Sequence, residues 1–356
     1  MEQYANLGDS AGALASCRKA IELLEPLYGV DQRDQNLTSR FANVLTHAGM
    51  FACSTGDATG GLALQRRAVT MMEALAAANP DSQSIEQELL AARHWLRFAL
   101  EDNNQLAEAI EQSHRLKDGL QKLVAADSKN ALFRRNLSVT CNILGRQFLL
   151  AGNLAAALEN HQLALTIDEE VIAANPESAE RKADLAVSLW RMGEAQTAQG
   201  QYESALQNLR KALALREPVI AANPTNSRAR DDVASIHAAI GKALAATGDF
   251  SGAIAAYEKA IPLAEEVSKQ APTNAKYRAR LAQRYAELGR LPREFAAAQP
   301  GASKEHLQRA RHHLARSAAV WQELREKKIL LPADAHKPDE VARELVICEA
   351  ALSAKT

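Results

Sequence analysis

Aromatic residues and net charge are both scarce in this 356-residue chain. Phe, Trp and Tyr supply only 4% of the residues although 47% are hydrophobic, so alanine accounts for much of the apolar content. That balance favours closely packed helices over a β-rich core. The 42 basic residues are offset by 43 acidic ones. The resulting charge of −1 gives no indication of a nucleic-acid or anionic-membrane partner.

Long apolar runs and clustered cysteines are also missing. No uncharged apolar segment approaches the roughly 18 residues that span a membrane, and the first residues do not resemble a secretory signal. Cys17, Cys53, Cys141 and Cys348 lie far apart, which favours buried thiols in a reducing compartment over disulfides or a zinc site. We therefore expect a cytoplasmic protein without a membrane or nucleic-acid partner.

The motifs of the common enzyme classes are absent too. The chain has no phosphate-binding glycine loop, no kinase HRD or DFG triplet, no serine nucleophile elbow and no HExxH helix. Its one histidine cluster is His306, His312 and His313. Adjacent residues on a helix point about 100° apart, so this cluster suits a solvated face better than a metal site. We expect no catalytic residue, cofactor or metal.

What the sequence does contain is a long internal repeat with a period of 48. A turn signal recurs at Gly8, Gly56, Gly152, Gly200 and Gly248, with Asn104 in the missing position. Asparagine follows glycine in its tolerance of left-handed backbone. Two further columns keep the same spacing: Leu14, Leu62, Ile110, Leu158, Leu206 and Ile254, and Phe41, Leu89, Leu137, Leu185, Val233 and Leu281. Such a register indicates a repeat architecture.

Each unit predicts two amphipathic helices. In the clearest unit, Leu185, Leu189 and Met192 share one face of a segment that ends at Gly200. A second apolar-periodic segment follows and ends at Asn223-Pro224, because glycine and Asn-Pro are typical helix ends. Neither helix can bury its apolar stripe alone, so neighbouring units must stack.

The unit resembles the tetratricopeptide repeat, whose pattern is W-x2-L-G-x2-Y, then A-x3-F and P, with a period of about 34 residues. The matching residues are Leu189, Met192, Gly193, Tyr202, Ala205, Leu209 and Ala212, and in the next unit Ile240, Gly241, Leu244, Phe250, Ala253, Tyr257 and Ala260. The longer unit of this chain amounts to about two added turns in each helix. The resemblance implies an all-α, right-handed superhelical solenoid of antiparallel helix pairs, with about 13–14 helices.

The repeat also defines the expected organisation. Residues 1–30 are predicted to be a partial first repeat, 31–290 the regular repeats, 291–303 a longer loop, 304–330 the last repeat helix and 331–356 a C-terminal capping helix. Gly145, Gly193, Gly241 and Gly289 are expected where paired helices approach closely, whereas Arg97 replaces this glycine in the third unit. The open N-terminal end suggests self-association.

The last segment carries a second resemblance. Trp321-Gln322-Glu323-Leu324, followed by Pro338 to Glu344, is similar to the C-terminal repeat regions of bacterial serine/threonine kinases. This similarity implies that the chain is a regulatory or oligomerisation segment linked to such a kinase, or a standalone relative. No kinase residue is present to carry catalysis.

Tetratricopeptide arrays bind protein or peptide ligands along their first helices, and the resemblance places the groove here around the packing glycines. The groove residues predicted by register are Asn142, Arg146, Trp190, Glu194, Lys242 and Arg290, together with His94 and Phe98 in the same two columns. Trp190 could anchor an acidic or aromatic peptide, since Trp and Arg dominate binding hot spots. The alternative is that Trp190 packs against the adjoining unit. We predict a protein- or peptide-binding scaffold.

Two columns of charge allow two interpretations. Arg134, Lys182, Arg230 and Arg278 lie near first-helix starts, and Glu25, Glu73, Glu169, Glu217 and Glu265 lie in the second helices. They predict either an intramolecular ladder of ion pairs within each hairpin or a surface for a charged partner.

Overall fold

The computed structural model describes residues 10–272, 274–298 and 304–353. Over these residues it contains 14 α-helices, one short 3-10 helix and no strand. The all-α prediction is therefore confirmed. Two compact units make up the chain, and the first takes Met1–Gln147 with Leu331–Ala333 while the second takes Phe148–Leu330 with Asp334–Thr356.

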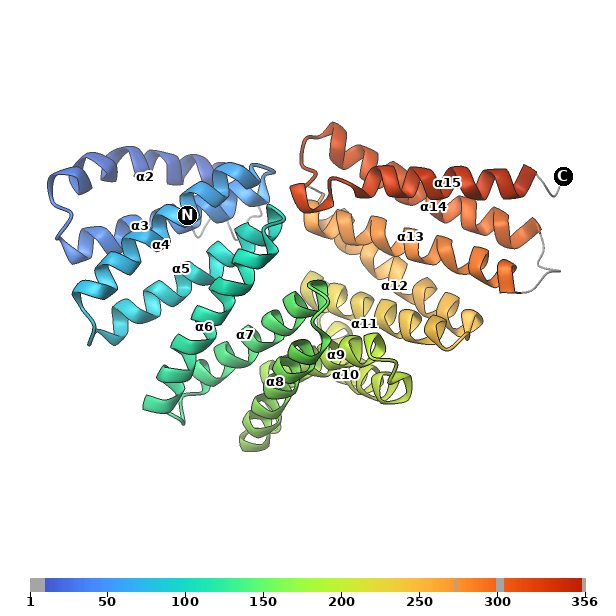
Figure 1. Ribbon diagram of the computed structural model, residues 1–356, viewed down its shortest axis with the longest axis horizontal. Coiled ribbons are helices and arrows are strands. Elements are labelled where there is room, and N and C mark those ends of the chain that lie inside the picture. The colour runs from blue at the N-terminus through green and yellow to red at the C-terminus, as the bar shows by residue number, and fades with distance from the viewer. Residues whose placement is uncertain (1–9, 273, 299–303, 354–356) are drawn as a thin grey trace. The chain divides into compact units, whose positions relative to one another are not determined.

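The first unit consists of successive antiparallel helices. They are α2 (Ser10–Val30), α3 (Gln35–Ser54), α4 (Ala58–Ala78), α5 (Gln83–Asp102), α6 (Leu106–Ala126) and α7 (Ala131–Leu150), and the boundary of the unit falls within α7. Figure 1 shows them from blue to green, and each of α3, α4 and α5 packs against its chain neighbour on either side.

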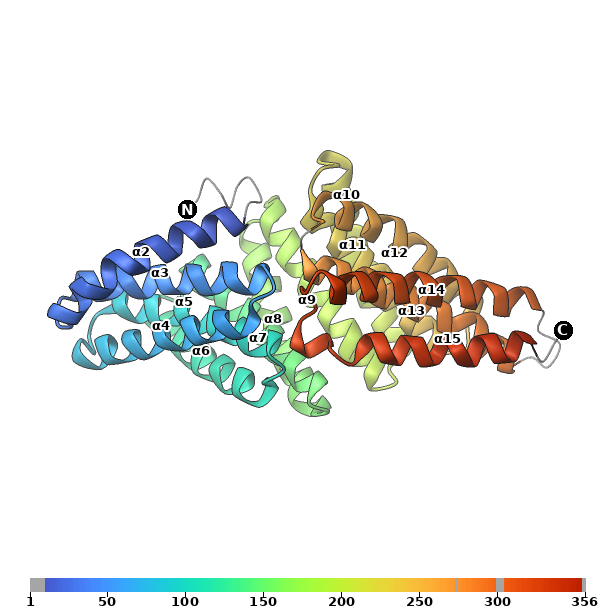
Figure 2. The same ribbon diagram turned by 90° about the horizontal axis from the view of Figure 1, so that it is seen from above.

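The second unit continues the same alternation. Its helices are α8 (Leu154–Ala174), α9 (Ala179–Ala198), α10 (Tyr202–Ala222), α11 (Ser227–Ala246), α12 (Phe250–Gln270), α13 (Ala275–Ala298), α14 (Lys304–Glu326) and α15 (Lys337–Ser353), with the 3-10 helix η1 (Pro332–Asp334) before the last. Figure 2 shows α14 and α15 side by side, in agreement with their contacts.

Helix starts follow the sequence columns. The first helices of the hairpins, α3, α5, α7, α9, α11 and α13, begin at residues 35, 83, 131, 179, 227 and 275, which are 48 apart. The second helices from α4 to α12 begin at 58, 106, 154, 202 and 250, again 48 apart. Each of these first helices except α13 has 20 residues and each of these second helices has 21, so each is about 30 Å long.

The turn inside each hairpin is fixed by backbone conformation. Gly56, Gly152, Gly200 and Gly248 have φ between +78° and +96°, and Asn104 has φ +60°. Asparagine is thus left-handed where glycine is missing, as the sequence predicts. The next residue then caps the second helix at three of these turns, where Asp57, Asn153 and Asp249 accept a hydrogen bond from the backbone N–H three positions on. Gly8 lies outside the described residues.

Small residues bring the paired helices close together. Ala68, Ala164, Ala212 and Ala260 are fully buried. A Cβ added to Gly193 would lie 2.7 Å from Leu209 Cγ, and one on Gly241 would lie 2.6 Å from Tyr257 Cε2. Close approach therefore requires glycine on the first helix wherever the residue that faces it on the second helix is large.

The third repeat has a different pair of side chains at this helix–helix contact. Arg97 occupies the glycine position and is fully buried. In the register that pairs Gly193 with Leu209, its counterpart on the second helix is Ser113, which is also fully buried. A small side chain on the second helix leaves room for the arginine on the first helix. The contact between α5 and α6 is less extensive than that between α3 and α4 or between α11 and α12.

One predicted boundary is wrong. The loop expected from residue 291 does not begin there, because α13 continues to Ala298; residues 299–303 lie outside the described residues. Pro292 predicts a helix end in the sequence, yet Pro26, Pro218 and Pro262 also lie inside helices of this chain. A long helix that is held by tertiary packing tolerates one lost backbone hydrogen bond.

The helix predicted as a C-terminal cap corresponds to α15, which residues of the segment Trp321 to Glu344 connect to α13 and α14. Trp321, Leu324 and Val341 share a buried cluster. Glu323 pairs with Arg278 of α13, and Glu340 and Glu344 both pair with Arg290. Each of these side chains has a structural role in closing the array.

Three glutamates of the glutamate column form ion pairs between repeats, with arginines that lie outside the predicted basic column. Arg67 binds Glu25 at 2.5 Å, Arg115 binds Glu73 at 3.4 Å and Arg316 binds Glu265 at 2.9 Å, and each pair joins consecutive second helices. Arg278 of the basic column pairs with Glu323 of α14, the second helix of its own hairpin, but Glu323 does not belong to the predicted glutamate column. Glu25, Glu73 and Glu265 are thus paired within the chain, although these exposed pairs each contribute only about 0–1 kcal/mol.

Candidate functional site on the first-helix face

First helices of neighbouring hairpins contact one another within each unit. This holds for α3 with α5 in the first unit and for α9 with α11 and α11 with α13 in the second. The solvent-facing side of these helices is here called the first-helix face, and it is described separately for each unit.

Polar side chains bridge adjacent first helices at a spacing of one repeat plus one residue. Ser39 of α3 donates to Glu88 of α5, and Ser235 of α11 accepts from Arg284 of α13 at 2.6 Å. Asp231 also pairs with Arg280 at the same spacing. These residues were not predicted, although polar residues at this spacing outside the apolar columns would have been a signal for them.

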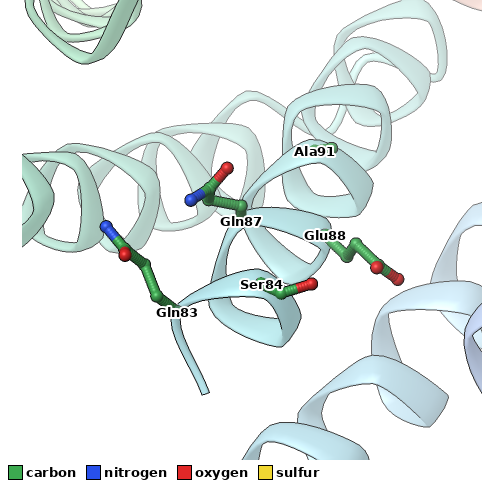
Figure 3. A pocket seen from close by; sticks show the side chains of 5 residues that line it. All are labelled: Gln83, Ser84, Gln87, Glu88 and Ala91. Carbon is green, nitrogen blue, oxygen red and sulfur yellow. The ribbon is translucent and has the colours of Figure 1, made fainter. Parts of the chain in front are cut away.

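In the first unit, α5 carries a shallow open depression of about 460 Å³. Its lining is Gln83, Ser84, Gln87, Glu88 and Ala91. Figure 3 shows Glu88 and Ser84 directed to one side of α5, and Gln83 and Gln87 to the other. The depression is polar and wide, so it suits an extended segment or a helix better than a small molecule.

Three rings continue the same side of α5 one turn beyond Ala91. His94, Trp95 and Phe98 are each half-buried. His94 meets Trp95 and Phe98 edge to face, at centroid distances of 5.4 and 5.1 Å, and Trp95 lies 5.7 Å from Phe98. Aromatic side chains make up only 4% of this chain, so a cluster of three half-buried rings is a distinctive feature of this surface.

Charged side chains of α5 and α7 contact the ring cluster and the helical turn that follows it. The Arg97 guanidinium lies 3.8 Å from the Phe98 ring centroid and donates to His94 Nδ1 at 3.4 Å. Glu101 accepts from Arg146 of α7 at 2.6 Å and from Gln147 at 2.7 Å. The Arg97 guanidinium therefore lies against the ring of Phe98, and Arg146 and Gln147 connect α7 to the same end of α5.

Burial controls ionisation in this cluster. Burial, with a contribution from Arg97, lowers the pKa of His94 to about 3, so the imidazole is neutral at physiological pH. Burial also lowers the pKa of Arg97 to about 10, which still leaves it charged. Burial opposes ionisation of Glu101 as well, but Arg146 and Arg97 outweigh it and its pKa lies below the ordinary value.

The predicted groove residues of the first unit are thus placed unequally. Arg146 is half-buried on α7, with 30% of its side chain exposed, and binds Glu101. Asn142, one turn earlier, is buried. His94 and Phe98 come together as the two columns predict, whereas Trp95 between them belongs to neither column and was not predicted.

In the second unit, Trp190 is mostly a core residue. It is buried in a cluster with Leu165, Leu209 and Ile236, in line with the packing alternative. The guanidinium of Arg191 lies 3.8 Å from its ring centroid and binds Glu194 at 2.7 Å. Trp190 Nε1 is buried without a hydrogen-bond partner among the described residues.

The remaining two predicted residues differ in accessibility. Lys242 is exposed on α11, and its charge partly offsets the burial that raises the pKa of Glu287. Arg290 donates to Glu344 at 2.9 Å and to Glu340 at 3.0 Å. A ligand of Arg290 would have to displace two carboxylates of α15.

Sites of other kinds are not apparent in the described part of the chain. Residues 10–272, 274–298 and 304–353 contain no group of three or more His, Cys, Asp or Glu side chains placed to hold a metal ion. Within the same ranges, no helix combines the length and the apolarity that a membrane span requires.

Comparison with known proteins identifies the repeat type. Residues 186–218 and 234–266 match the tetratricopeptide repeat model, and the second match begins one repeat period after the first. The two matches cover the close contacts of Gly193 with Leu209 and of Gly241 with Tyr257. A comparison with curated proteins found no match.

Solved structures share the fold at low sequence identity. BtubC (BKLC) from P. vanneervenii is 15% identical over 73% of this chain and 92% of its own, with a TM-score of 0.52. Apo RapI is 13% identical over 95% of this chain and 81% of its own, also with 0.52. A Rap protein in complex with competence and sporulation factor is 14% identical over 97% and 87%, with 0.50.

Proposed function

We propose that this protein is a scaffold that binds a protein or peptide partner on its first-helix face. The observation that carries the proposal is the half-exposed cluster of His94, Trp95 and Phe98 on α5, beside Arg146 of α7. Aromatic and arginine side chains supply most of the energy at protein interfaces. The adjoining depression on α5 extends the same surface by two turns.

The wider set of groove residues is retained as part of this proposal. In the first unit these are Asn142 and Arg146, and in the second they are Trp190, Glu194, Lys242 and Arg290. Lys242 is the most exposed of the second set. The peptide complex of a Rap protein supports the idea that a related fold accommodates a peptide, and repeat arrays offer extended surfaces for such ligands.

The test is affinity capture with the purified full chain, followed by mass spectrometry. The first variant is Trp95→Ala with Arg146→Gln in the first unit, and the second is Trp190→Ala with Lys242→Glu in the second unit. The matched control is Lys122→Glu, which changes an exposed residue of the second helix α6. All variants are checked for native helicity by circular dichroism.

We expect a partner that wild type and the α6 control retain and that the first variant loses. Loss with the second variant alone would assign binding to the second unit and remove α5 as the carrier. Equal capture by both site variants and wild type would contradict binding on the first-helix face.

A second candidate is a regulatory or oligomerisation role beside a kinase. Its support is the segment from Trp321 to Glu344, whose residues close the second unit. The decisive observation is the genomic reading frame: an in-frame kinase domain joined to this chain would support the role, and its absence would leave the scaffold alone.

A further inference from the structure

The helix α2 presents an apolar stripe that no described residue covers. Leu23, Leu27 and Val30 are 66%, 56% and 88% exposed. They are spaced by four and three positions, so they lie on one face of the helix. A neighbouring face of α2 is anchored, because Ile21, Leu24 and Tyr28 pack against the core of the first unit.

Later repeats show what this stripe is shaped to contact. Met71 and Leu75, one repeat after Leu23 and Leu27, are buried, and so are Ile167 and Val171 three repeats after. Ala20 is half-buried, whereas the alanines of its column are fully buried. The second helix α4, which carries Met71 and Leu75, packs against α3, the antiparallel first helix of its own hairpin. The face of α2 is therefore complementary to an antiparallel apolar helix.

We propose that a second copy of this chain supplies that helix, through a two-fold pairing of α2 with α2. The stripe is self-complementary: about a centre at residue 25, Leu23 lies opposite Leu27 of the other copy, and Ala20 lies opposite Val30. A two-fold axis perpendicular to the helices makes such a pair antiparallel. Glu25 does not interfere at the centre, because it points away and binds Arg67.

The size of the stripe sets the strength of the dimer. A fully exposed Leu or Val side chain offers on the order of 100 Å² of apolar surface, so the three residues provide roughly 200 Å² per copy at their observed exposures. Stable interfaces bury about 1,200–2,000 Å² in total. The stripe falls well below that area, so the pair is expected to be weak and to form only at high protein concentration.

The experiment is sedimentation equilibrium of the full chain over a concentration series from about 10 to 500 μM, which reaches the high concentrations that a weak pair requires. The mass should rise from 38.6 kDa towards twice that value. Leu23→Glu with Leu27→Glu should raise the dissociation constant at least tenfold. The control is Leu132→Glu on α7, a leucine that is 57% exposed, and it should behave as wild type.

A cross-link tests the geometry independently of affinity. Leu23→Cys with Leu27→Cys should form an intermolecular disulfide under mild oxidation, whereas Leu132→Cys should not. A monomeric wild type over the whole series would overturn the proposal. A dimer that survives the double glutamate variant, or a mass that continues past the dimer, would overturn it too, because a two-fold pair is closed. The partner-binding variants on α5 leave this stripe intact, so the two proposals fail independently.

Discussion

The α5–α6 hairpin in the first unit and the α11–α12 hairpin in the second unit differ at one pair of facing positions: the large side chain is on the first helix in one and on the second helix in the other. In α11 the first helix has Gly241 and the second helix has the large Tyr257. In α5 the first helix has Arg97 and the second has Ser113. In both hairpins a large side chain at one of two facing positions accompanies a small one at the other, and in α5 the arginine also places a charge against the half-buried Phe98 ring.

The largest loss of stability is expected when the arginine of the α5–α6 hairpin is placed at the glycine position of the α11–α12 hairpin. Gly241→Arg should destabilise the α11–α12 hairpin by about 3–5 kcal/mol, because it overpacks against Tyr257 and buries an unpaired cation. Adding Tyr257→Ser should recover part of the loss. Hydrogen exchange read locally on α11 and α12 is the measurement, since an array need not unfold in one step. Wild-type exchange in the single variant would contradict the volume argument.

The converse change should have a somewhat smaller effect. Arg97→Gly leaves a cavity over Ser113 and should destabilise the α5–α6 hairpin by about 2–4 kcal/mol. Ser113→Leu in the same chain should restore much of it, because leucine faces glycine in the α9–α10 hairpin. The double-mutant cycle from local hydrogen exchange gives the coupling. Additive effects of the two changes would show that the positions are independent.

Acid pH should lower the stability of the α5–α6 hairpin through His94. Its folded pKa is about 3, below the ordinary 6.5, so above pH 6.5 neither state gains a proton and stability is unaffected. Below pH 6.5 only the unfolded state is protonated, and stability falls towards pH 3 by at most about 1.4 kcal/mol per unit. His94→Gln should flatten the curve between pH 6.5 and 4.5, measured by urea titration. An unchanged slope would contradict the burial of His94.

Release of the C-terminal helix is expected to be milder. Glu340→Gln with Glu344→Gln removes both charged partners of Arg290 and should destabilise α15 by about 1 kcal/mol, with less effect in high salt. Faster exchange confined to α15 is the expected result. Asp339→Asn is the matched control, since Asp339 pairs with the exposed Arg325 rather than with α13.

The smallest change in stability is expected for the ion pairs of Glu73, which join α4 to α5 and α6. Glu73→Gln breaks the pairs with Arg93 and Arg115 and should change stability by no more than about 1 kcal/mol. Thermal unfolding followed by circular dichroism is sufficient to detect a larger value. A loss well above that limit would mean that the ladder stabilises the array more than solvent-exposed ion pairs usually do.

Much of the fold could be predicted because the repeat reports it several times. The left-handed Asn104 and the glycine turns were readable from one column. The end of α13 was not readable, because a proline is a local signal and tertiary packing decides whether a helix passes it. Trp190 shows the same limit, since a register position cannot tell a buried ring from an exposed one.

The sequence by itself determined the helices of the regular repeats, their lengths and their order, because apolar periodicity and turn residues act locally and recur in every repeat. Tertiary structure alone decided which of those residues face solvent together. Arg146 of α7 binds Glu101, which lies on the same helix as His94, Trp95 and Phe98, and Arg290 of α13 binds Glu344 of α15. Such pairings depend on contacts between residues of different helices far apart in the chain, and no local pattern specifies them.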